Sequence, residues 1–211
     1  MIIAIDGNSG SGKGTVAKYL ANKFSLFHID TGLIYRAVAY RALVENLDFS
    51  TEDTMIELLG LLEESDFDLP CLRDEEIGNM ASKIAVHPSF RKKVTEYVLH
   101  LIKIASPSFQ GVVIDGRDIG SVVCPDAEIK FHLTADPAVR AERRLKEKKH
   151  SLDNKNSNMI KNLKERDDRD KNRSASPLVM VDGALLINTS KLSIEEVNQK
   201  VDEYVKPFFS T

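Results

Sequence analysis

A glycine-rich segment near the start of the chain has the residue types and spacing that could hold phosphate groups. It comprises Gly7, Asn8, Ser9, Gly10, Ser11, Gly12, Lys13, Gly14 and Thr15. Glycines let the backbone fold so tightly that several N–H groups point at one anion. A lysine at the end of such a loop adds a mobile cation for the outer phosphates. The segment is therefore predicted to bind a nucleoside triphosphate.

The residues on either side of this segment support that interpretation over a flexible Gly/Ser turn. Residues 1–5 are a short apolar run typical of a buried strand, and residues 16–24 carry apolar side chains at helical spacing. A strand, a glycine-rich turn and a helix start form the context in which a G-x-x-x-x-G-K match is credible. The helix start adds the positive end of its dipole to the loop.

The residue after Lys13 departs from the general form of this motif. Gly14 stands where a serine or threonine usually binds Mg²⁺, and the hydroxyl follows one place later at Thr15. Asp115 ends an apolar run. A carboxylate at this position could hold a metal-bound water, and a purely structural role is an equal alternative. Thr15 and Asp115 are the candidate Mg²⁺ ligands, directly or through water.

Arginines outside the loop could supply positive charge to a second anion. Phosphoryl transfer between two anions requires positive charge on both sides of the transferred group, in-line alignment and exclusion of water. Arg36 and Arg117 each follow a predicted strand closely, and more arginines lie in the charged segment 164–173. By itself that segment would be a solvated helix with ion pairs between neighbouring turns. Beside a phosphate site, a closing lid is an equal alternative.

The elements that must position these residues follow a βα pattern. Short apolar runs predict strands at residues 1–5, 26–30, 112–115, 128–133 and 185–189. Helical segments lie between them, which predicts an α/β fold with a mostly parallel sheet of about five strands and helices on both faces. Ligands of such sheets bind beyond the carboxyl ends of the strands. The loop at 7–15, Thr31 and residues 115–118 all fall there.

Prolines and capping residues mark the helix boundaries. Residues 75–86 and 89–105 are predicted to be two helices broken at Pro88. Asp136 and Pro137 are typical of a helix start. The helix that follows carries three arginines that either reach the triphosphate or form a solvated face: Arg140, Arg143 and Arg144.

Composition limits the fold and the partners. A chain of 211 residues can bury one core, so a single domain over residues 1–211 is expected. The net charge of −3 argues against nucleic-acid binding, and no apolar run approaches the length of a membrane span. Cys71 and Cys124 lack metal-ligand spacing and are expected to be free thiols in a reducing cytosol. We therefore expect a cytoplasmic protein with no signal peptide, and nothing requires more than a monomer.

Four segments, in order along nearly the whole chain, together resemble the bacterial cytidylate kinases. They are G-N-S-G-S-G-K-G-T (7–15), D-T-G-L-I-Y-R (30–36), I-D-G-R-D-I-G (114–120) and K-E-R-D-D-R-D-K-N-R (164–173). The first marks only a large superfamily, whereas the last two together are specific. The resemblance implies a P-loop NTPase-type fold and transfer of the γ-phosphoryl group of ATP to CMP or dCMP, with Mg²⁺.

The resemblance also implies a role for each matched residue. Those expected at the transferring group are Lys13, Arg166 and Arg173. Those expected at the acceptor monophosphate are Thr31, Arg36 and Arg117. Those expected at the cytosine base are Ser82, Arg91 and Asp118, with Asp170 near the ribose. On sequence alone, Ser82 would be an ordinary helix-surface serine, and Asp118 could instead form a turn with a local ion pair to Arg117.

The chemistry of cytosine supports the base assignments independently. Cytosine presents an amino donor at N4 and acceptors at N3 and O2. The carboxylate of Asp118 suits N4, while the Arg91 guanidinium and the Ser82 hydroxyl can donate to the acceptors. Uracil carries an acceptor in place of the amino group, so the same residues would reject it.

The expected subdivision of the domain departs from the family at one place. The core is assigned to residues 1–31, 106–147 and 175–211, the acceptor-binding segment to 32–105 and a mobile lid to 148–174. The family usually carries a β-hairpin insert within the acceptor-binding segment. Residues 65–78 have no paired alternating runs, so the insert is expected to be shortened or absent.

Two other functions remain as alternatives. A kinase on the same scaffold could act on UMP or on a non-nucleotide acceptor. A nucleotide-binding switch without an acceptor is the alternative from a different class. As a GTPase it would need a guanine-reading N-K-x-D segment, but the N-K at 154–155 lacks the aspartate. A switch would also leave the arginines at 36, 117, 166 and 173 without a role.

Overall fold

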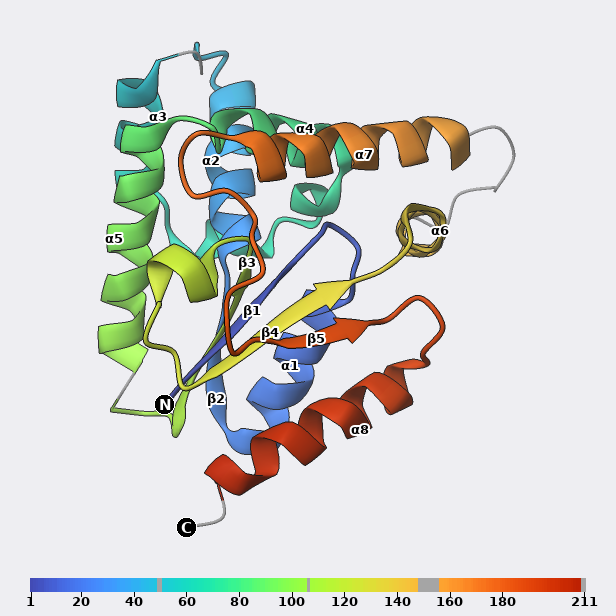
Figure 1. Cartoon of the computed structure of the whole chain (residues 1–211). Helices are drawn as coiled ribbons and strands as arrows, with labels where there is room; N and C mark the ends of the chain where they lie inside the picture. The colour runs from blue at the N-terminus through green and yellow to red at the C-terminus, as the bar shows by residue number, and fades with distance from the viewer. Residues whose placement is uncertain (49–50, 106, 148–155, 210–211) are drawn as a thin grey trace.

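A parallel five-stranded sheet forms the centre of the molecule (Figure 1). This computed structural model describes residues 1–48, 51–105, 107–147 and 156–209. The strands are β1 (Ile2–Gly7), β2 (Leu26–Asp30), β3 (Gly111–Gly116), β4 (Ile129–Thr134) and β5 (Leu185–Asn188). They lie in the order β2-β3-β1-β4-β5, and every pairing is parallel. The predicted parallel sheet of about five strands is confirmed.

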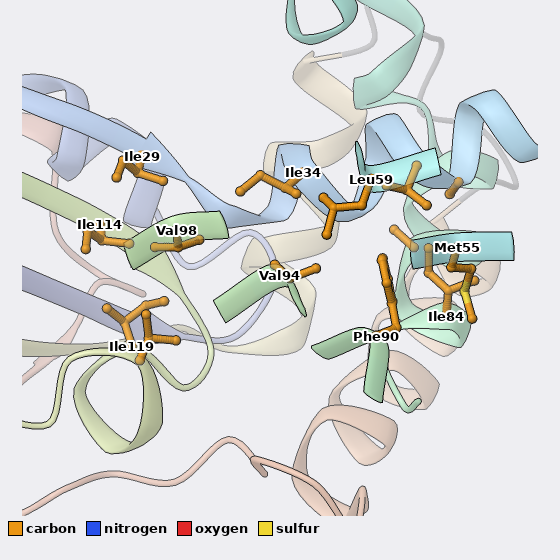
Figure 2. Packing of buried hydrophobic residues seen from close by; sticks show 14 of the residues in the cluster. Ile29, Ile34, Met55, Leu59, Ile84, Phe90, Val94, Val98, Ile114 and Ile119 are labelled. Carbon is orange, nitrogen blue, oxygen red and sulfur yellow. The ribbon is translucent and has the colours of Figure 1, made fainter. Parts of the chain in front are cut away.

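Helices cover both faces of the sheet because successive side chains of each buried strand point to opposite sides. Ile3 and Ile5 of β1 pack with α1 (Lys13–Phe24) and α8 (Ile194–Val205). Ala4 packs on the other side. That second core includes buried residues from four helices (Figure 2): α2 (Thr31–Val44), α3 (Glu52–Gly60), α4 (Glu75–Ile84) and α5 (Pro88–Ala105).

The segment between β2 and β3 is helical throughout its regular structure. Two 3₁₀ turns, η1 (Glu64–Asp68) and η2 (Pro70–Arg73), precede α4 (Glu75–Ile84), and α5 begins at Pro88. The predicted break before Pro88 is present. Among the described residues from 31 to 110 there is no strand, so no β-hairpin occupies this segment. The stretch at 65–78, where the insert is expected to be shortened or absent, consists of these turns and the start of α4.

The carboxyl-terminal part of the chain places a charged helix over the end of the sheet. α6 (Pro137–Glu147) and α7 (Asn156–Asn172) pack through Ala141, Leu145, Met159 and Leu163. α7 also contacts α4, and Figure 1 shows it crossing above the strands. Of the lid expected at 148–174, residues 148–155 lie outside the described residues. The rest forms α7 and the start of the coil that follows it.

Two short elements and one cap complete the fold. A π-helical turn, η3 (Ile119–Val123), follows β3, and a 3₁₀ turn, η4 (Lys206–Phe208), follows α8. Ser193 caps α8: its hydroxyl accepts from the Glu196 N–H at 3.1 Å, and the Glu196 carboxylate accepts from the Ser193 N–H at 2.8 Å. None of the helices in the described ranges is both long and apolar enough to cross a membrane.

Gly7 offers a direct test of how tightly the phosphate-binding loop is held against the sheet. Its φ is 144°, and a Cβ at this position would lie 1.9 Å from the Leu133 carbonyl oxygen of β4. We expect Gly7→Ala to lower the free energy of unfolding by roughly 3 kcal/mol or more, measured by urea denaturation. In the control Gly60→Ala, a Cβ meets no atom within 4 Å, and the change should stay within about 1 kcal/mol. Equal midpoints for the two variants would contradict this packing.

Candidate active site

A cavity of about 770 Å³ lies at the carboxyl ends of the strands and gathers most of the predicted site residues. Every one of them lines it except Gly7 and Asn8. The lining residues among them are Ser9, Gly10, Ser11, Gly12, Lys13, Gly14, Thr15, Thr31, Arg36, Ser82, Arg91, Asp115, Arg117, Asp118, Arg166, Asp170 and Arg173. Segments far apart in sequence therefore meet around one space large enough for small-molecule ligands.

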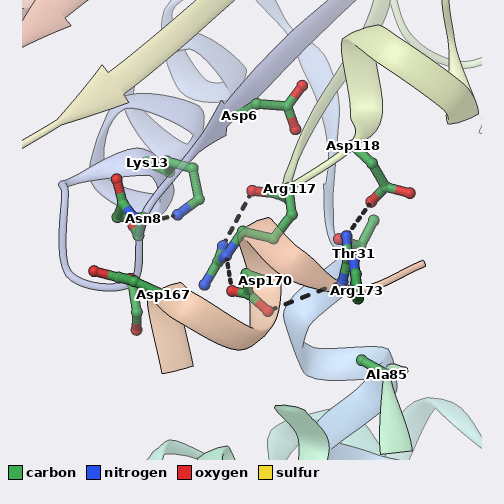
Figure 3. Close-up of polar contacts among 12 residues, drawn as sticks. Asp6, Asn8, Lys13, Thr31, Ala85, Arg117, Asp118, Asp167, Asp170 and Arg173 are labelled. Atoms are coloured by element: carbon green, nitrogen blue, oxygen red, sulfur yellow. Dashed lines mark hydrogen bonds and ion pairs between the residues drawn. The ribbon is translucent and has the colours of Figure 1, made fainter. Parts of the chain in front are cut away.

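The phosphate-binding loop adopts the geometry that its glycines permit. Gly10 and Gly12 have φ values of 76° and 97°, and Gly12 immediately precedes α1. The Lys13 ammonium donates to the Asn8 carbonyl at 2.8 Å inside the loop (Figure 3). Burial, reinforced by the charge of Arg117, holds the pKa of Lys13 well below its usual range. A bound anion would relieve that unfavourable environment.

Residues that are not among the predicted site residues form hydrogen bonds to the phosphate-binding loop. The Arg140 guanidinium donates to the Ser9 carbonyl at 3.0 Å, and the Thr189 hydroxyl donates to the Ser11 carbonyl at 3.0 Å. Arg144 donates to the Ser9 hydroxyl at 3.2 Å. Arg143 and Arg144 line the cavity, whereas Arg140 does not and is 2% exposed. Both alternatives for Arg140 were therefore wrong: it neither lines the cavity nor lies on a solvated face.

The side of the cavity formed by α2 and α4 holds a second set of buried polar groups. The Thr31 hydroxyl donates to the Asp115 carbonyl oxygen at 2.9 Å. Arg36 donates to the carbonyls of Leu72 and Asp74. Burial and the charge of Arg166 lower the pKa of Arg36 to about 9. A bound anion would therefore stabilise the charged form of the Arg36 guanidinium as well.

Arg91 and Asp118 form a buried ion pair beside a buried hydroxyl. Arg91 Nη2 donates to Asp118 Oδ2 at 2.5 Å, and Nη1 donates to the Ala85 carbonyl at 3.0 Å. The Ser82 hydroxyl and Arg91 Nε are buried without a hydrogen-bond partner. Unpaired buried donors are costly, so these atoms point to a ligand that supplies acceptors. Ser82 is 4% exposed and is not a helix-surface serine.

Two charged side chains of α7, Arg166 and Asp170, also face the cavity. Arg117 Nε donates to Asp170 Oδ2 at 2.7 Å, so Arg117 does not form the alternative local pair with Asp118 (Figure 3). Burial and the charge of Arg117 lower the pKa of Arg166 to about 10. Burial acts to raise the pKa of Asp170, but Arg117, Arg166 and Arg173 together hold it below its usual value. This face of α7 is part of the cavity, which excludes the solvated-helix alternative.

Asp6 is a buried acidic residue that sequence reasoning missed. Its two carboxylate oxygens accept the N–H groups of Ile119 and Gly120, each at 2.8 Å. Asp6 thereby ties the end of β1 to the turn that follows Asp118 in the chain. Burial is the main cause that raises its pKa to about 6. A carboxylate at the end of an apolar strand was the signal that could have found it.

The two predicted metal ligands, Thr15 and Asp115, both line the cavity. Thr15 is exposed at the cavity, and Asp115 is buried there with Oδ1 2.8 Å from His28 Nε2. Burial raises the pKa of Asp115, and the charge of Asp30 adds to this. Among the described residues, no group of three His, Cys, Asp or Glu side chains could hold a metal ion. One hydroxyl and one carboxylate fit Mg²⁺ that takes its other ligands from phosphates and water.

Comparison with known proteins assigns the chain to a family. The family model described as "Cytidylate kinase" matches residues 3–207. The chain belongs to the cytidylate kinase family. A protein named cytidylate kinase from Bradyrhizobium sp. is 43% identical over 92% of this chain and 91% of its own length. Another of that name, from Bartonella tribocorum, is 41% identical over 98% and 94%. The resemblance based on the four sequence segments is confirmed.

Comparison with solved structures supports the fold alone. An uncharacterized protein from Eubacterium ventriosum superposes with a TM-score of 0.55 at 16% identity, over 98% of each chain. At that identity the similarity concerns only the arrangement of strands and helices in this cytidylate kinase family member.

The raised pKa of Asp6 predicts a pH-dependent stability. A carboxyl group with a folded pKa of about 6 against 3.8 stabilises the fold fully below the lower value, and this contribution is lost as the pH rises through 6. A shift of about two units corresponds to about 3 kcal/mol. We therefore expect the stability of the wild type relative to Asp6→Asn to fall between about pH 4 and pH 7, measured by urea unfolding.

The matched control for this experiment is Asp126→Asn. Asp126 is exposed, and its replacement should leave the pH dependence of stability unchanged. Any constant cost of placing an amide opposite the two N–H donors would shift the Asp6→Asn curve without altering its slope. Parallel curves for wild type and Asp6→Asn would contradict the assignment.

Proposed function

We propose that this protein transfers the γ-phosphoryl group of ATP to CMP or dCMP, giving ADP and CDP or dCDP. The observation that carries the proposal is the position of the Arg91–Asp118 pair and Ser82 in the same cavity as the phosphate-binding loop. A nucleotide-binding loop alone would suit many proteins. A buried donor and acceptor pair facing the same cavity suits a second, base-containing substrate. Membership of the cytidylate kinase family supports this assignment.

The base would be read through adjacent hydrogen-bonding groups. Cytosine presents the N4 donor next to the N3 acceptor. Asp118 offers an acceptor next to the donors of Arg91, whose bond to Asp118 is 2.5 Å long. The unpaired Ser82 hydroxyl and Arg91 Nε can donate to N3 and O2. With uracil, Asp118 would face another oxygen and Arg91 would face an N–H group, so both contacts become repulsive.

The donor nucleotide would place its phosphates on residues 7–15, against the start of α1 and Lys13. Thr15 and Asp115 would hold Mg²⁺, directly or through water. A divalent cation held by these residues would supply positive charge beside the phosphates. The backbone N–H groups of the loop and Lys13 orient the phosphates from the protein side.

The acceptor phosphate would lie between Arg36 and Arg117, near Thr31. In this structure Arg117 is engaged with Asp170. A phosphate that binds Arg117 would leave the Asp170 carboxylate available to a ribose hydroxyl. Arg166 of α7 and Arg173, which directly follows this helix, would then contact the transferring group. Such chemistry rests on positioning and electrostatic stabilisation, with no covalent intermediate.

The remaining expectations belong to the same proposal. The proposed subdivision into core, acceptor-binding segment and lid is supported by a cavity whose lining residues come from β3, α4 and α7, among other segments. The proposal includes a cytoplasmic monomer without a nucleic-acid or membrane partner. The net charge of −3 argues against nucleic-acid binding, and the free thiols of Cys71 and Cys124 fit a reducing compartment.

A substrate panel tests the proposal directly. ADP production from Mg-ATP would be measured with CMP, dCMP, UMP, AMP and GMP offered one at a time. We expect fast turnover with CMP and dCMP and little with the others. Equal use of UMP would retain the kinase and reject the base-reading scheme. ADP production that does not depend on any acceptor would overturn the proposal.

Asp118→Asn tests the base-reading carboxylate separately. An amide presents a donor as well as an acceptor, so it can tolerate the oxygen of uracil. We expect the ratio of kcat/KM for CMP to that for UMP to fall by about tenfold or more. The exposed Asp126→Asn variant serves as the control and should keep the ratio of the wild type. An unaltered ratio in Asp118→Asn would remove Asp118 from base recognition.

A further inference from the structure

Arg140 makes a buried connection between the phosphate-binding loop and α7. Its guanidinium donates from Nε to the Ala135 carbonyl at 2.9 Å and from Nη1 to the Ser9 carbonyl at 3.0 Å. The third contact, from Nη2, reaches Asp167 Oδ2 at 2.6 Å. One planar group therefore joins the start of α6, the loop and α7. Arg140 lies outside the cavity lining, so these contacts do not depend on a ligand.

Asp167 occupies a special position on α7. It directly follows Arg166 and lies one turn before Asp170, both of which line the cavity. The side chain of Asp167 instead bonds to Arg140, and its Oδ1 atom is buried without a partner. Figure 3 shows Asp167 and Asp170 on the same helix. Fixing Asp167 thus fixes the rotation of α7 and, with it, the direction in which Arg166 points.

The ion pair between Arg140 and Asp167 is buried. The side chains of Arg140 and Asp167 are 3% and 10% exposed. A buried ion pair is strongly destabilised when one partner is removed, because the other charge is left uncompensated. Close packing adds to this on the loop side, where a Cβ on Gly10 would lie 3.2 Å from Arg140 Cβ. One buried side chain therefore connects the loop directly to α7.

We propose that Arg140 and Asp167 are positioning residues that couple occupancy of the phosphate-binding loop to the placement of α7. The proposal rests on the function proposed above, in which Arg166 and Arg173 act on the transferring phosphoryl group. Phosphates that order the loop would order α7 through the Ser9–Arg140–Asp167 chain. Coupling of this kind is reciprocal, so an ordered α7 also favours the loop conformation that holds phosphate.

The primary experiment follows α7 without any acceptor. Hydrogen–deuterium exchange of peptides within residues 159–172 would be compared with and without the Mg²⁺ complex of β,γ-imido-ATP. In the wild type we expect the analogue to slow exchange across α7. In Asp167→Asn, which keeps the shape of the side chain and removes its charge, we expect at least half of that slowing to be lost. By the same reciprocity the Kd of the analogue should rise, but by no more than about threefold, because the loop keeps its bond to Arg140.

Steady-state kinetics supply the second readout. We expect Asp167→Asn to lower kcat by about tenfold while the KM for ATP changes by less than about threefold, because misplacement of Arg166 affects the transition state. Asp167→Leu, which cannot accept a hydrogen bond, should show the larger loss. The control is Asp168→Asn, which alters the exposed neighbour on the same helix and should match the wild type in both readouts.

The possible outcomes separate the coupling from the proposed function. Equal slowing of α7 exchange in wild type and Asp167→Asn would overturn the coupling, as would the absence of any slowing in the wild type. A kcat that falls only in proportion to ATP affinity would also overturn it, since this would indicate a purely structural role. If the wild type failed to phosphorylate CMP, the proposed function would fall, while the exchange experiment would still decide on the coupling.

Discussion

Repulsion between buried cations is the constraint on which the arrangement of the cavity depends. Burial lowers the pKa values of Lys13, Arg36 and Arg166, and each is lowered further by neighbouring arginines. Gathering like charges in a partly desolvated space opposes folding, so the fold must supply compensation. Ion pairs such as Arg117–Asp170 supply part of it. The remaining positive charge is uncompensated, which favours an anionic ligand before any specific contact is considered.

The fold meets this constraint by fixing loops to rigid elements through backbone groups. Asp6 accepts two backbone N–H groups of the turn after Asp118, and Thr189 and Arg140 donate to carbonyls of the phosphate-binding loop. Such bonds hold a loop in one conformation and leave the side chains that face the cavity able to contact a ligand. Preorganised groups need little rearrangement when charge moves during the reaction, and this is the main source of electrostatic catalysis.

Local patterns explain what could be predicted from the sequence. The loop at 7–15, the apolar strands and the break before Pro88 are each encoded within a few residues, and parallel strands bring their carboxyl ends together. The supporting residues have no such signal, because Arg140 reaches Ser9 across 131 positions of sequence. Arg140, Arg143 and Arg144 are identical in type, and only the packing of α6 against α7 decides which one is buried. Ser82 was predicted through the family resemblance, because a serine in a helix carries no local signal, and its buried hydroxyl has no hydrogen-bond partner in the part of the chain that the structure describes.

The alternating charges beside the base site connect recognition to transfer. Arg91 and Arg173 both approach Asp118, at 2.5 Å and 3.6 Å, and Arg173 also lies 3.9 Å from Asp170. Under the proposed function, a cytosine amino group at Asp118 would compete with Arg173 for that carboxylate, and a ribose hydroxyl would compete with it for Asp170. Arg173 would then be free to turn toward the phosphoryl group. A base that offers Asp118 no donor would leave Arg173 paired with it, so a poor substrate would weaken the catalytic electrostatics as well as its own binding.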